Sequence, residues 1–211
     1  MKLKRSFDIM ISSVAIVLLL PFLFIVAGLV AVSMGFPVLF CQERPGRNGK
    51  IFKMYKFRTM RNTYDKAGKP LPDAQRLTRL GRLLRATSVD ELPELFNVLK
   101  GNMSLVGPRP LLPKYMPYYT DRERLRHSVR PGITGYAQIK GRNTLCWDER
   151  LAYDVWYVEN WSFGLDIKIL FNTLLAVFIR EGVVVDAQSV MMNLDEERCA
   201  ATRRSKGGCS D

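Results

Sequence analysis

Two adjacent carboxylates, Asp90 and Glu91, lie in the most unusual stretch of the chain, Ser88-Val-Asp-Glu-Leu-Pro-Glu-Leu-Phe-Asn-Val-Leu99. Ser88 and Glu91 have the spacing of a capping box, which predicts that a helix begins here with Asp90 in its first turn. The free N–H groups and the dipole at a helix start keep a carboxylate ionised and also attract phosphate. Asp90 could therefore be a nucleophile that attacks phosphorus, or both carboxylates could simply cap a helix.

Three arginines in loops rich in Pro and Gly could supply the cations that such a site needs. Arg109 lies in Gly107-Pro-Arg-Pro110, and the other two lie in Arg130-Pro-Gly-Ile-Thr-Gly135 and Gly141-Arg142-Asn143. The planar guanidinium matches phosphate oxygens, although structural arginines are also common in such loops. Together, three such loops after one acidic segment favour a phosphate site.

The charge of the chain also indicates an anionic partner. Its 211 residues include 32 Lys and Arg against 20 Asp and Glu, a net charge of +12, which suits nucleic acid, anionic lipid or a phosphorylated substrate. The single histidine, His127, leaves acid–base chemistry to carboxylates. The four cysteines have no C-x-x-C spacing, which is typical of reduced thiols in a cytosolic protein.

The N-terminal segment is predicted to enter a membrane. No charged residue occurs from Ile9 to Gln42, and a helix over residues 9–34 would be about 39 Å long. Lys and Arg flank both ends of the segment, and both ends are therefore expected on the cytosolic side. Pro21, near its middle, should bend the helix into two arms of about 18 Å each. These features fit a re-entrant hairpin or a kinked spanning helix; a signal peptide is disfavoured because the apolar run is too long.

The remaining sequence predicts a mainly α fold with short β elements. We expect an extended segment at 51–60, an exposed loop at 62–73, an amphipathic helix at 75–85 with one arginine-rich face, and apolar helices at 148–161 and 165–180. The apolar helices could lie at the membrane interface or in a core. The predicted domains are an anchor at 1–40 with its break at Pro21, a compact cytosolic domain at 41–192, and a disordered tail at 193–211.

The ordered motifs resemble those of the small monotopic phosphoglycosyl transferases, also called bacterial sugar transferases. They cover nearly the whole chain: Lys4-Arg-Ser-Phe-Asp8, Arg44-Pro-Gly46, Lys56-Phe-Arg-Thr-Met60, Ser88 to Leu95, Asn97-Val-Leu-Lys-Gly101, the three arginine loops above, and Asp154. The resemblance implies a re-entrant helix-break-helix anchor at the cytosolic face of the bacterial inner membrane. Relatives often have Ser-Pro at the break, whereas this chain has Leu20-Pro21.

The same resemblance implies transfer of a sugar-1-phosphate from a UDP-sugar to undecaprenyl phosphate, with release of UMP and a requirement for Mg²⁺. By this carry-over Asp90 is the nucleophile that forms a covalent phosphosugar intermediate and also a Mg²⁺ ligand. Glu91 would deprotonate or position the polyprenyl phosphate. The implied substrate-binding residues are Lys56, Arg85, Arg109, Arg142 and Asp154.

Two other classes of function fit parts of the sequence. A non-enzymatic basic membrane protein that binds anionic lipid or a partner would explain the anchor and the charge. A nucleic-acid-binding module is disfavoured because acids are interspersed among the basic residues and no nucleic-acid motif is present. The sequence leaves the sugar, the glycan pathway and the oligomeric state open.

Overall fold

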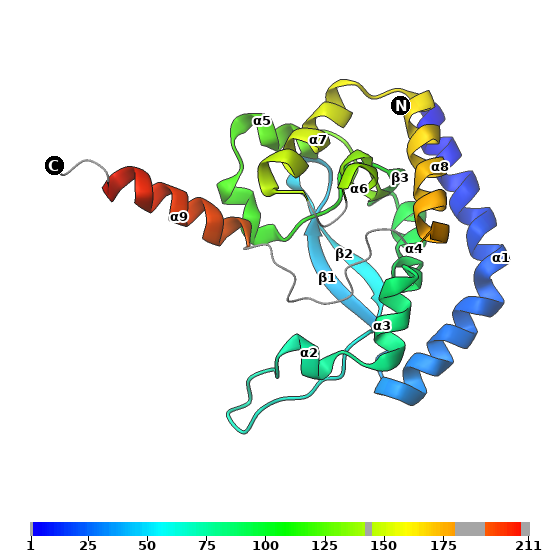
Figure 1. Ribbon diagram of the computed structural model, residues 1–211. Helices are drawn as coiled ribbons and strands as arrows, with labels where there is room; N and C mark the ends of the chain where they lie inside the picture. The colour runs from blue at the N-terminus through cyan, green and yellow to red at the C-terminus, as the bar shows by residue number, and fades with distance from the viewer. Residues whose placement is uncertain (1, 142–144, 180–192, 208–211) are drawn as a thin grey trace.

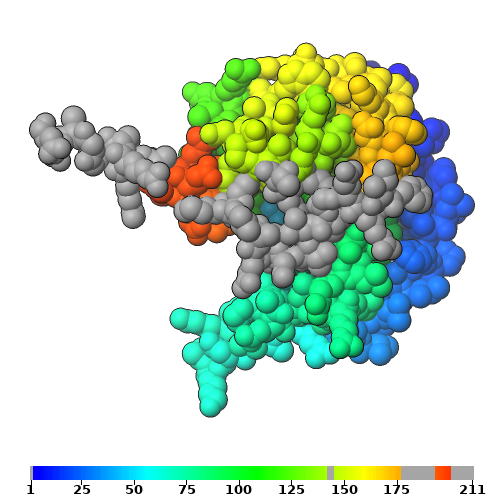
Figure 2. All heavy atoms as spheres, in the orientation of Figure 1, coloured from blue at the N-terminus to red at the C-terminus, as the bar shows by residue number. Residues whose placement is uncertain are grey.

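A long N-terminal helix, α1 (Lys2–Met34), curves along one side of the folded body formed by the other elements (Figure 1). The computed structural model describes residues 2–141, 145–179 and 193–207. The fold is mainly α with short strands, as the sequence predicts. In Figure 2, α1 forms the right edge of the molecule in blue, and the segment after the first hairpin projects from its lower side.

In the part of the chain that the structure describes, the strands form two small sheets. The first is an antiparallel hairpin of β1 (Leu39–Pro45) and β2 (Ile51–Phe57), in which Leu39 is opposite Phe57 and Phe40 is opposite Lys56. The second pairs β3 (Ser104–Val106) with β4 (Gly132–Thr134) in parallel. The extended segment predicted at 51–60 therefore corresponds to β2.

The helices and short 3₁₀ segments surround these sheets. The α-helices after α1 are α2 (Asp73–Arg76), α3 (Arg79–Ala86), α4 (Glu94–Leu99), α5 (Asp121–Arg124), α6 (Tyr136–Gly141), α7 (Trp147–Glu159), α8 (Phe163–Ile179) and α9 (Leu194–Gly207). The 3₁₀ segments are η1 (Arg47–Gly49), η2 (Val89–Glu91), η3 (Pro113–Tyr118) and η4 (Leu125–His127). The two apolar helices predicted at 148–161 and 165–180 are α7 and α8.

Polar contacts attach the start of α1 to the folded body. Lys4 Nζ lies 2.5 Å from Asp166 Oδ2 of α8 and also donates to the Val106 carbonyl. Asp8 is buried and accepts hydrogen bonds from the Ser104 hydroxyl and the Leu105 N–H of β3. Burying a charged group is costly unless it is paired in this way, so these contacts define where α1 docks.

The other end of α1 is attached to the same body. Arg58, directly after β2, donates to the Met34 and Pro37 carbonyls. Between the two ends, α1 packs apolar residues against two core clusters. Ile16 joins one cluster with Leu95 of α4, and Val30 joins another with Leu84 of α3. The helix therefore lies against the folded body along its length.

The structure differs from the sequence prediction at Pro21. The sequence predicts two arms separated by a break, whereas α1 remains helical through Pro21 and curves around the body (Figure 1). A proline inside a helix removes one hydrogen bond and can bend the helix without ending it. α1 is long and apolar enough to cross a membrane, and it exposes large apolar side chains, among them Val17, Leu18, Phe24, Ile25 and Val32.

The helix predicted at 75–85 is two helices in the structure. α2 ends at Arg76, and Thr78 then caps α3 by accepting a hydrogen bond from the Gly81 N–H at 2.9 Å. A Cβ on Gly81 would lie 1.9 Å from the Thr59 carbonyl oxygen, so only glycine allows α3 to approach the chain that follows β2. This approach places Arg85, near the end of α3, beside Thr59.

A helix occupies most of the segment that the sequence predicts to be a disordered tail. α9 is attached through fully buried Leu194, which packs with Trp147 and Leu151. Arg198 forms salt bridges with Glu123 and Asp148. The low content of apolar residues predicts disorder in this tail, but one buried leucine and ion pairs to distant residues hold the start of this helix.

Candidate active site

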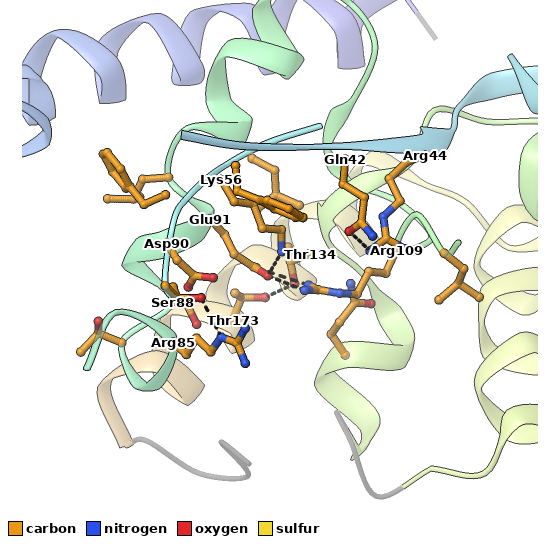
Figure 3. Close-up of a pocket in the computed structure, with 18 of the residues that line it drawn as sticks. Gln42, Arg44, Lys56, Arg85, Ser88, Asp90, Glu91, Arg109, Thr134 and Thr173 are labelled. Atoms are coloured by element: carbon orange, nitrogen blue, oxygen red, sulfur yellow. Dashed lines mark hydrogen bonds and ion pairs between the residues drawn. The ribbon is translucent and has the colours of Figure 1, made fainter. Parts of the chain in front are cut away.

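A cavity of about 960 Å³ opens between the hairpin, η2 and the loop after β3. Figure 3 shows Asp90, Glu91, Lys56, Arg85 and Arg109 around it. The sequence predicts that these residues share one site, although they come from different elements. The cavity is also lined by Thr134 at the end of β4 and Thr173 of α8, whose hydroxyls are 2.7 Å apart.

The local structure at Ser88 excludes the capping box. Ser88 has φ 57°, in the left-handed region, and its side chain makes no capping hydrogen bond. The next residues form the single 3₁₀ turn η2 rather than the start of a regular helix. The Glu91 carboxylate instead binds Lys56 Nζ at 2.5 Å and the Arg109 guanidinium. The capping interpretation of Asp90 and Glu91 is therefore wrong, because distant cations rather than the local backbone bind Glu91.

Asp90 is the carboxylate that remains available in the cavity. It is 9% exposed, and no described residue donates a hydrogen bond to its carboxylate. Burial and the neighbouring Glu91 charge raise the pKa of Asp90 to about 6, against the lowering effect of Lys56, Arg109 and Arg85. Asp90 is therefore largely ionised at neutral pH and more basic than an ordinary carboxylate, as a nucleophile or general base requires.

Glu91 has the opposite electrostatics. Burial raises its pKa, but the charges of Arg109 and Lys56 outweigh burial and hold the pKa below the ordinary value for glutamate. Glu91 is thus an ion-pair partner that orients two cations. The two neighbouring carboxylates of η2 therefore differ: Glu91 is paired with cations, and Asp90 faces the cavity unpaired by any described residue.

Lys56 is positioned by residues of α4 that the sequence analysis did not identify. Its Nζ also lies 3.2 Å from Glu94 Oε1, and burial followed by the Glu91 charge raises the pKa of Glu94. Asn97, fully buried, accepts a hydrogen bond from the Tyr55 N–H and donates one to the Lys53 carbonyl, both in the part of β2 just before Lys56. The spacing of Glu91, Glu94 and Asn97 by three residues was the available signal, since such residues share one face of a helical segment.

Arg109 is positioned by a close approach between two of the sequence motifs. Gly107 and Gly132 pack backbone against backbone, and a Cβ on Gly132 would lie 2.1 Å from the Gly107 nitrogen. A Cβ on Gly135 would lie 2.2 Å from the Gly107 carbonyl oxygen. The glycines of both motifs are required for this approach, which aligns β3 with β4 and directs Arg109 toward Glu91.

Asp154 lines the cavity, but its carboxylate is occupied. Asp154 is 1% exposed and its Oδ2 accepts from Nη2 and Nε of Arg126 at 2.7 and 3.1 Å. Arg126 also donates to the Arg109 carbonyl at 2.6 Å. The pair therefore supports the loop that carries Arg109. Arg126 itself was not singled out from the sequence, because nothing in the local pattern of η4 distinguishes it from its neighbouring basic residues.

Comparison with known proteins agrees with this arrangement. The family model described as bacterial sugar transferase matches residues 1–180. The chain belongs to the bacterial sugar transferase family. This sugar transferase is 51% identical over 183 residues to the uncharacterised sugar transferase EpsL of Bacillus subtilis, which covers 87% of this chain and 91% of EpsL.

Two longer relatives have names that state an activity. The sugar transferase is 40% identical over 198 residues to the undecaprenyl-phosphate galactose phosphotransferase of Salmonella typhimurium, with 85% of this chain and 41% of the relative covered. It is 42% identical over 191 residues to the UDP-glucose:undecaprenyl-phosphate glucose-1-phosphate transferase of Klebsiella pneumoniae, with 86% and 41% covered. The chain thus spans about two-fifths of each of these two relatives.

One of the loop arginines expected at the site of this sugar transferase lies elsewhere. Arg130 is not among the described residues that line the cavity, and its Nε donates to the Gly101 carbonyl at 2.9 Å. Arg142 lies outside the described residues. Arg85 does line the cavity and donates from Nε to the Thr59 hydroxyl. Of the loop arginines that the structure describes, Arg109 therefore lines the cavity and Arg130 does not.

The donor set of the sugar transferase is compatible with Mg²⁺. Within the described ranges no three His, Cys, Asp or Glu side chains come together, so an all-protein metal cage is not formed there. Mg²⁺ usually binds through one or two carboxylates together with waters and substrate phosphates. Asp90, which faces the cavity without a hydrogen-bond partner in the described chain, meets that requirement as a single protein ligand.

Proposed function

We propose that this chain transfers a sugar-1-phosphate from a UDP-sugar to undecaprenyl phosphate, with Asp90 as the nucleophile. The observation that carries the proposal is the contrast between Glu91, which is bound by two cations, and Asp90, which faces the same cavity with its pKa raised to about 6. The names of the Salmonella and Klebsiella relatives support the substrate classes. They name different sugars, so the sugar accepted by this chain is a matter for experiment.

The reaction proceeds in two displacements at phosphorus. An Asp90 oxygen attacks the sugar-bearing phosphate, the bond to the second phosphate breaks, and UMP leaves with the electron pair of that bond. An oxygen of undecaprenyl phosphate then attacks the same phosphorus, releases Asp90 and forms undecaprenyl-diphosphate-sugar. Covalent catalysis divides one exchange between like-charged phosphates into two steps, and each needs nearby cations.

The surrounding side chains supply positive charge and orientation. Lys56 and Arg85 line the cavity near Asp90, and Arg109 approaches from the opposite wall. Mg²⁺, held by Asp90 and substrate phosphate oxygens, would reduce the repulsion between the phosphates and the carboxylate. Glu91 remains ionised and keeps Lys56 and Arg109 in place, so its role is to position these cations rather than to accept a proton.

The proposed topology is a re-entrant anchor with the cavity on the cytosolic side. Both ends of α1 are bonded to one folded body, through Lys4 and Asp8 at the start and Met34 at the end. Because the body also packs along α1 between those ends, a spanning α1 would draw part of this polar body into the hydrocarbon region. The exposed apolar residues of α1 would enter one leaflet, while basic residues contact anionic lipid headgroups.

Cysteine labelling in membrane vesicles tests this topology. Single cysteines placed at Lys2 and Lys53, in a variant without the native cysteines, should react with an impermeant maleimide from the same side of the membrane. Labelling from opposite sides would show that α1 spans the bilayer and would contradict the re-entrant anchor.

The transfer reaction is tested with purified protein in detergent, Mg²⁺, undecaprenyl phosphate and a panel of UDP-sugars. UMP release by the wild type and its loss in Asp90→Asn are expected, with Asp121→Asn, an exposed aspartate on α5, as the matched control. Without the lipid acceptor, intact-protein mass spectrometry should detect one added sugar phosphate on the wild type only. If Asp90→Asn is as active as the wild type, the covalent mechanism is wrong. If no UDP-sugar yields UMP, a non-enzymatic membrane role becomes the better explanation.

A further inference from the structure

A row of three side chains on β1 forms one wall of the cavity. Phe40, Gln42 and Arg44 alternate with outward-facing residues, as expected for one face of a strand, and all three line the cavity. The row changes from apolar to polar to cationic as β1 leaves the end of α1. Figure 3 shows Gln42 and Arg44 at the end of the cavity away from Asp90 and Arg85.

Arg44, unlike two other arginines that line the cavity, has no carboxylate partner among the described residues. Glu91 pairs with Arg109, and Asp154 pairs with Arg126. No carboxylate in the described chain forms a salt bridge with Arg44. Its Nη2 donates to Gln42 Oε1 at 2.7 Å, and its Nε is buried without a hydrogen-bond partner. A half-buried guanidinium in this state has unused donors for an anion.

The neighbourhood of Arg44 has an excess of positive charge. Burial and the nearby Arg109 charge lower the pKa of Arg44 to about 10, so it remains protonated at neutral pH. Arg150 also lines the cavity, and its pKa is lowered by burial and then by Arg109. Cations that disfavour one another in a partly buried wall are stabilised when an anion binds between them.

We propose that Arg44, oriented by Gln42, binds the phosphate that stays on the nucleoside when the sugar-bearing phosphate is transferred. This inference rests on the proposed function for the identity of the nucleotide. Both the UDP-sugar and undecaprenyl phosphate carry a phosphate ester that Arg44 could bind. The position of Arg44 in the fold favours the UDP-sugar. Leu39 to Arg44 spans about 17 Å of strand at about 3.3 Å per residue, so Arg44 lies far along β1 from the end of the membrane helix. The lipid phosphate enters from the membrane, whereas the nucleotide enters from water.

The proposal explains the placement of two separate cationic regions. Lys56 and Arg85 lie near Asp90, where the transferred phosphate reacts, and Arg44 lies beyond Arg109. A nucleoside diphosphate sugar carries two adjacent phosphates, one of which leaves with the nucleoside. The fork-shaped guanidinium of arginine can bind this phosphate both before transfer, when it is part of the diphosphate, and after transfer, when it is the terminal phosphate of the released nucleotide. Arg44 is then a binding residue for the nucleotide and not a residue of the reacting centre.

Equilibrium binding to the full-length protein in detergent tests the inference directly. The probes are UMP, uridine and a short-chain polyprenyl phosphate, measured by calorimetry with the wild type, Arg44→Gln, Arg44→Lys and the control Lys53→Gln. Lys53 is exposed on β2 and its replacement removes the same charge. Arg44→Gln should weaken UMP binding about ten- to a hundredfold and leave the affinities for uridine and for polyprenyl phosphate unchanged. Arg44→Lys should recover part of the loss, and Lys53→Gln should match the wild type.

Three outcomes would overturn the inference. These are equal UMP affinity in Arg44→Gln and wild type, equal affinity of the wild type for UMP and uridine, or a loss confined to polyprenyl phosphate. Each is independent of catalysis, because binding of UMP needs no transfer. If wild type binds UMP through Arg44 but releases none from any UDP-sugar, the proposed reaction fails while the phosphate site stands. If transfer occurs and Arg44→Gln binds UMP normally, only the assignment of Arg44 fails.

Discussion

Arg126 links the Asp154 carboxylate to the loop that carries Arg109. Its Nη2 lies 2.7 Å from Asp154 Oδ2 and 2.6 Å from the Arg109 carbonyl oxygen, and the side chains of the Arg126–Asp154 pair are each 2% exposed. Asp154 acts through Arg126, because its carboxylate is already bonded. This geometry makes Asp154 a positioning residue for the Arg109 loop.

Replacing Asp154 by Asn should therefore reduce stability as well as activity. The substitution leaves the Arg126 charge buried without its carboxylate, which costs about 3–5 kcal/mol of unfolding free energy. Thermal unfolding in detergent would measure the loss. The control is Arg122→Gln, which removes an exposed pair with Glu159 at 3.5 Å and should cost at most about 1 kcal/mol. Equal losses in the two variants would argue against a structural role for the buried pair.

The close approach of Gly107 and Gly132 predicts intolerance of a single methyl group. Gly132→Ala would place Cβ 2.1 Å from the Gly107 nitrogen, so β3 and β4 must separate and the Arg109 loop must shift. We expect at least a tenfold loss of UMP release, since a misplaced cation no longer meets the reacting phosphate. Gly164→Ala on α8 is the matched control, because nothing lies within 4 Å of a Cβ there. Wild-type activity in Gly132→Ala would contradict the packing.

His127 predicts a loss of stability at acidic pH. Burial, followed by the Arg126 charge, lowers its pKa to about 4, whereas an unfolded histidine titrates near 6.5. The folded protein binds this proton less readily than the unfolded chain. The contribution of His127 to the free energy of unfolding is therefore fully present above pH 6.5 and is lost as the pH falls toward 4. The loss from this one group is at most about 3 kcal/mol. Melting temperatures of wild type and His127→Gln at pH 7.5 and 5 would measure it.

The variant separates histidine from the carboxylates that also titrate in acid. His127→Gln should lose less stability than wild type over the same pH interval. The ring signal of this single histidine, followed by NMR, should titrate near pH 4. A midpoint near 6.5, or identical pH dependence in the two proteins, would contradict the buried neutral state.

The attachment of α1 is tested at Lys4. Lys4→Met leaves Asp166, whose side chain is 3% exposed, without its cation, although Tyr157 and Trp161 still donate to it. We expect a destabilisation of about 2–4 kcal/mol, slightly smaller than for a buried charge with no remaining donor. Lys2→Met, at an exposed position on the same helix, should have little effect. Equal melting temperatures for the two variants would show that the start of α1 is not held by this pair.

Local patterns in the sequence were sufficient for the elements whose stability depends on near neighbours. The charge-free run from Ile9 to Gln42 predicted the long apolar helix, and apolar periodicity predicted α7 and α8, because helical contacts join residues three and four apart. The ordered motifs were also sufficient to recognise the family and to group Asp90, Glu91, Lys56, Arg85 and Arg109 in one site.

Tertiary structure decided which charged groups bind one another. Ser88 and Glu91 have capping-box spacing, yet Glu91 is bound by Lys56, 35 residues away, and by Arg109, 18 residues away. Asp154 is likewise occupied by Arg126, and Leu194 holds a helix that composition alone predicts to be disordered. Removing one partner of a buried ion pair costs about 3–5 kcal/mol, whereas removing a local helix cap costs about 1 kcal/mol. The partners of such a pair are brought together only by the packing of the whole chain. The sequence therefore identifies which residues form the site. The fold determines that Glu91 is paired with cations and that Asp90 stays available.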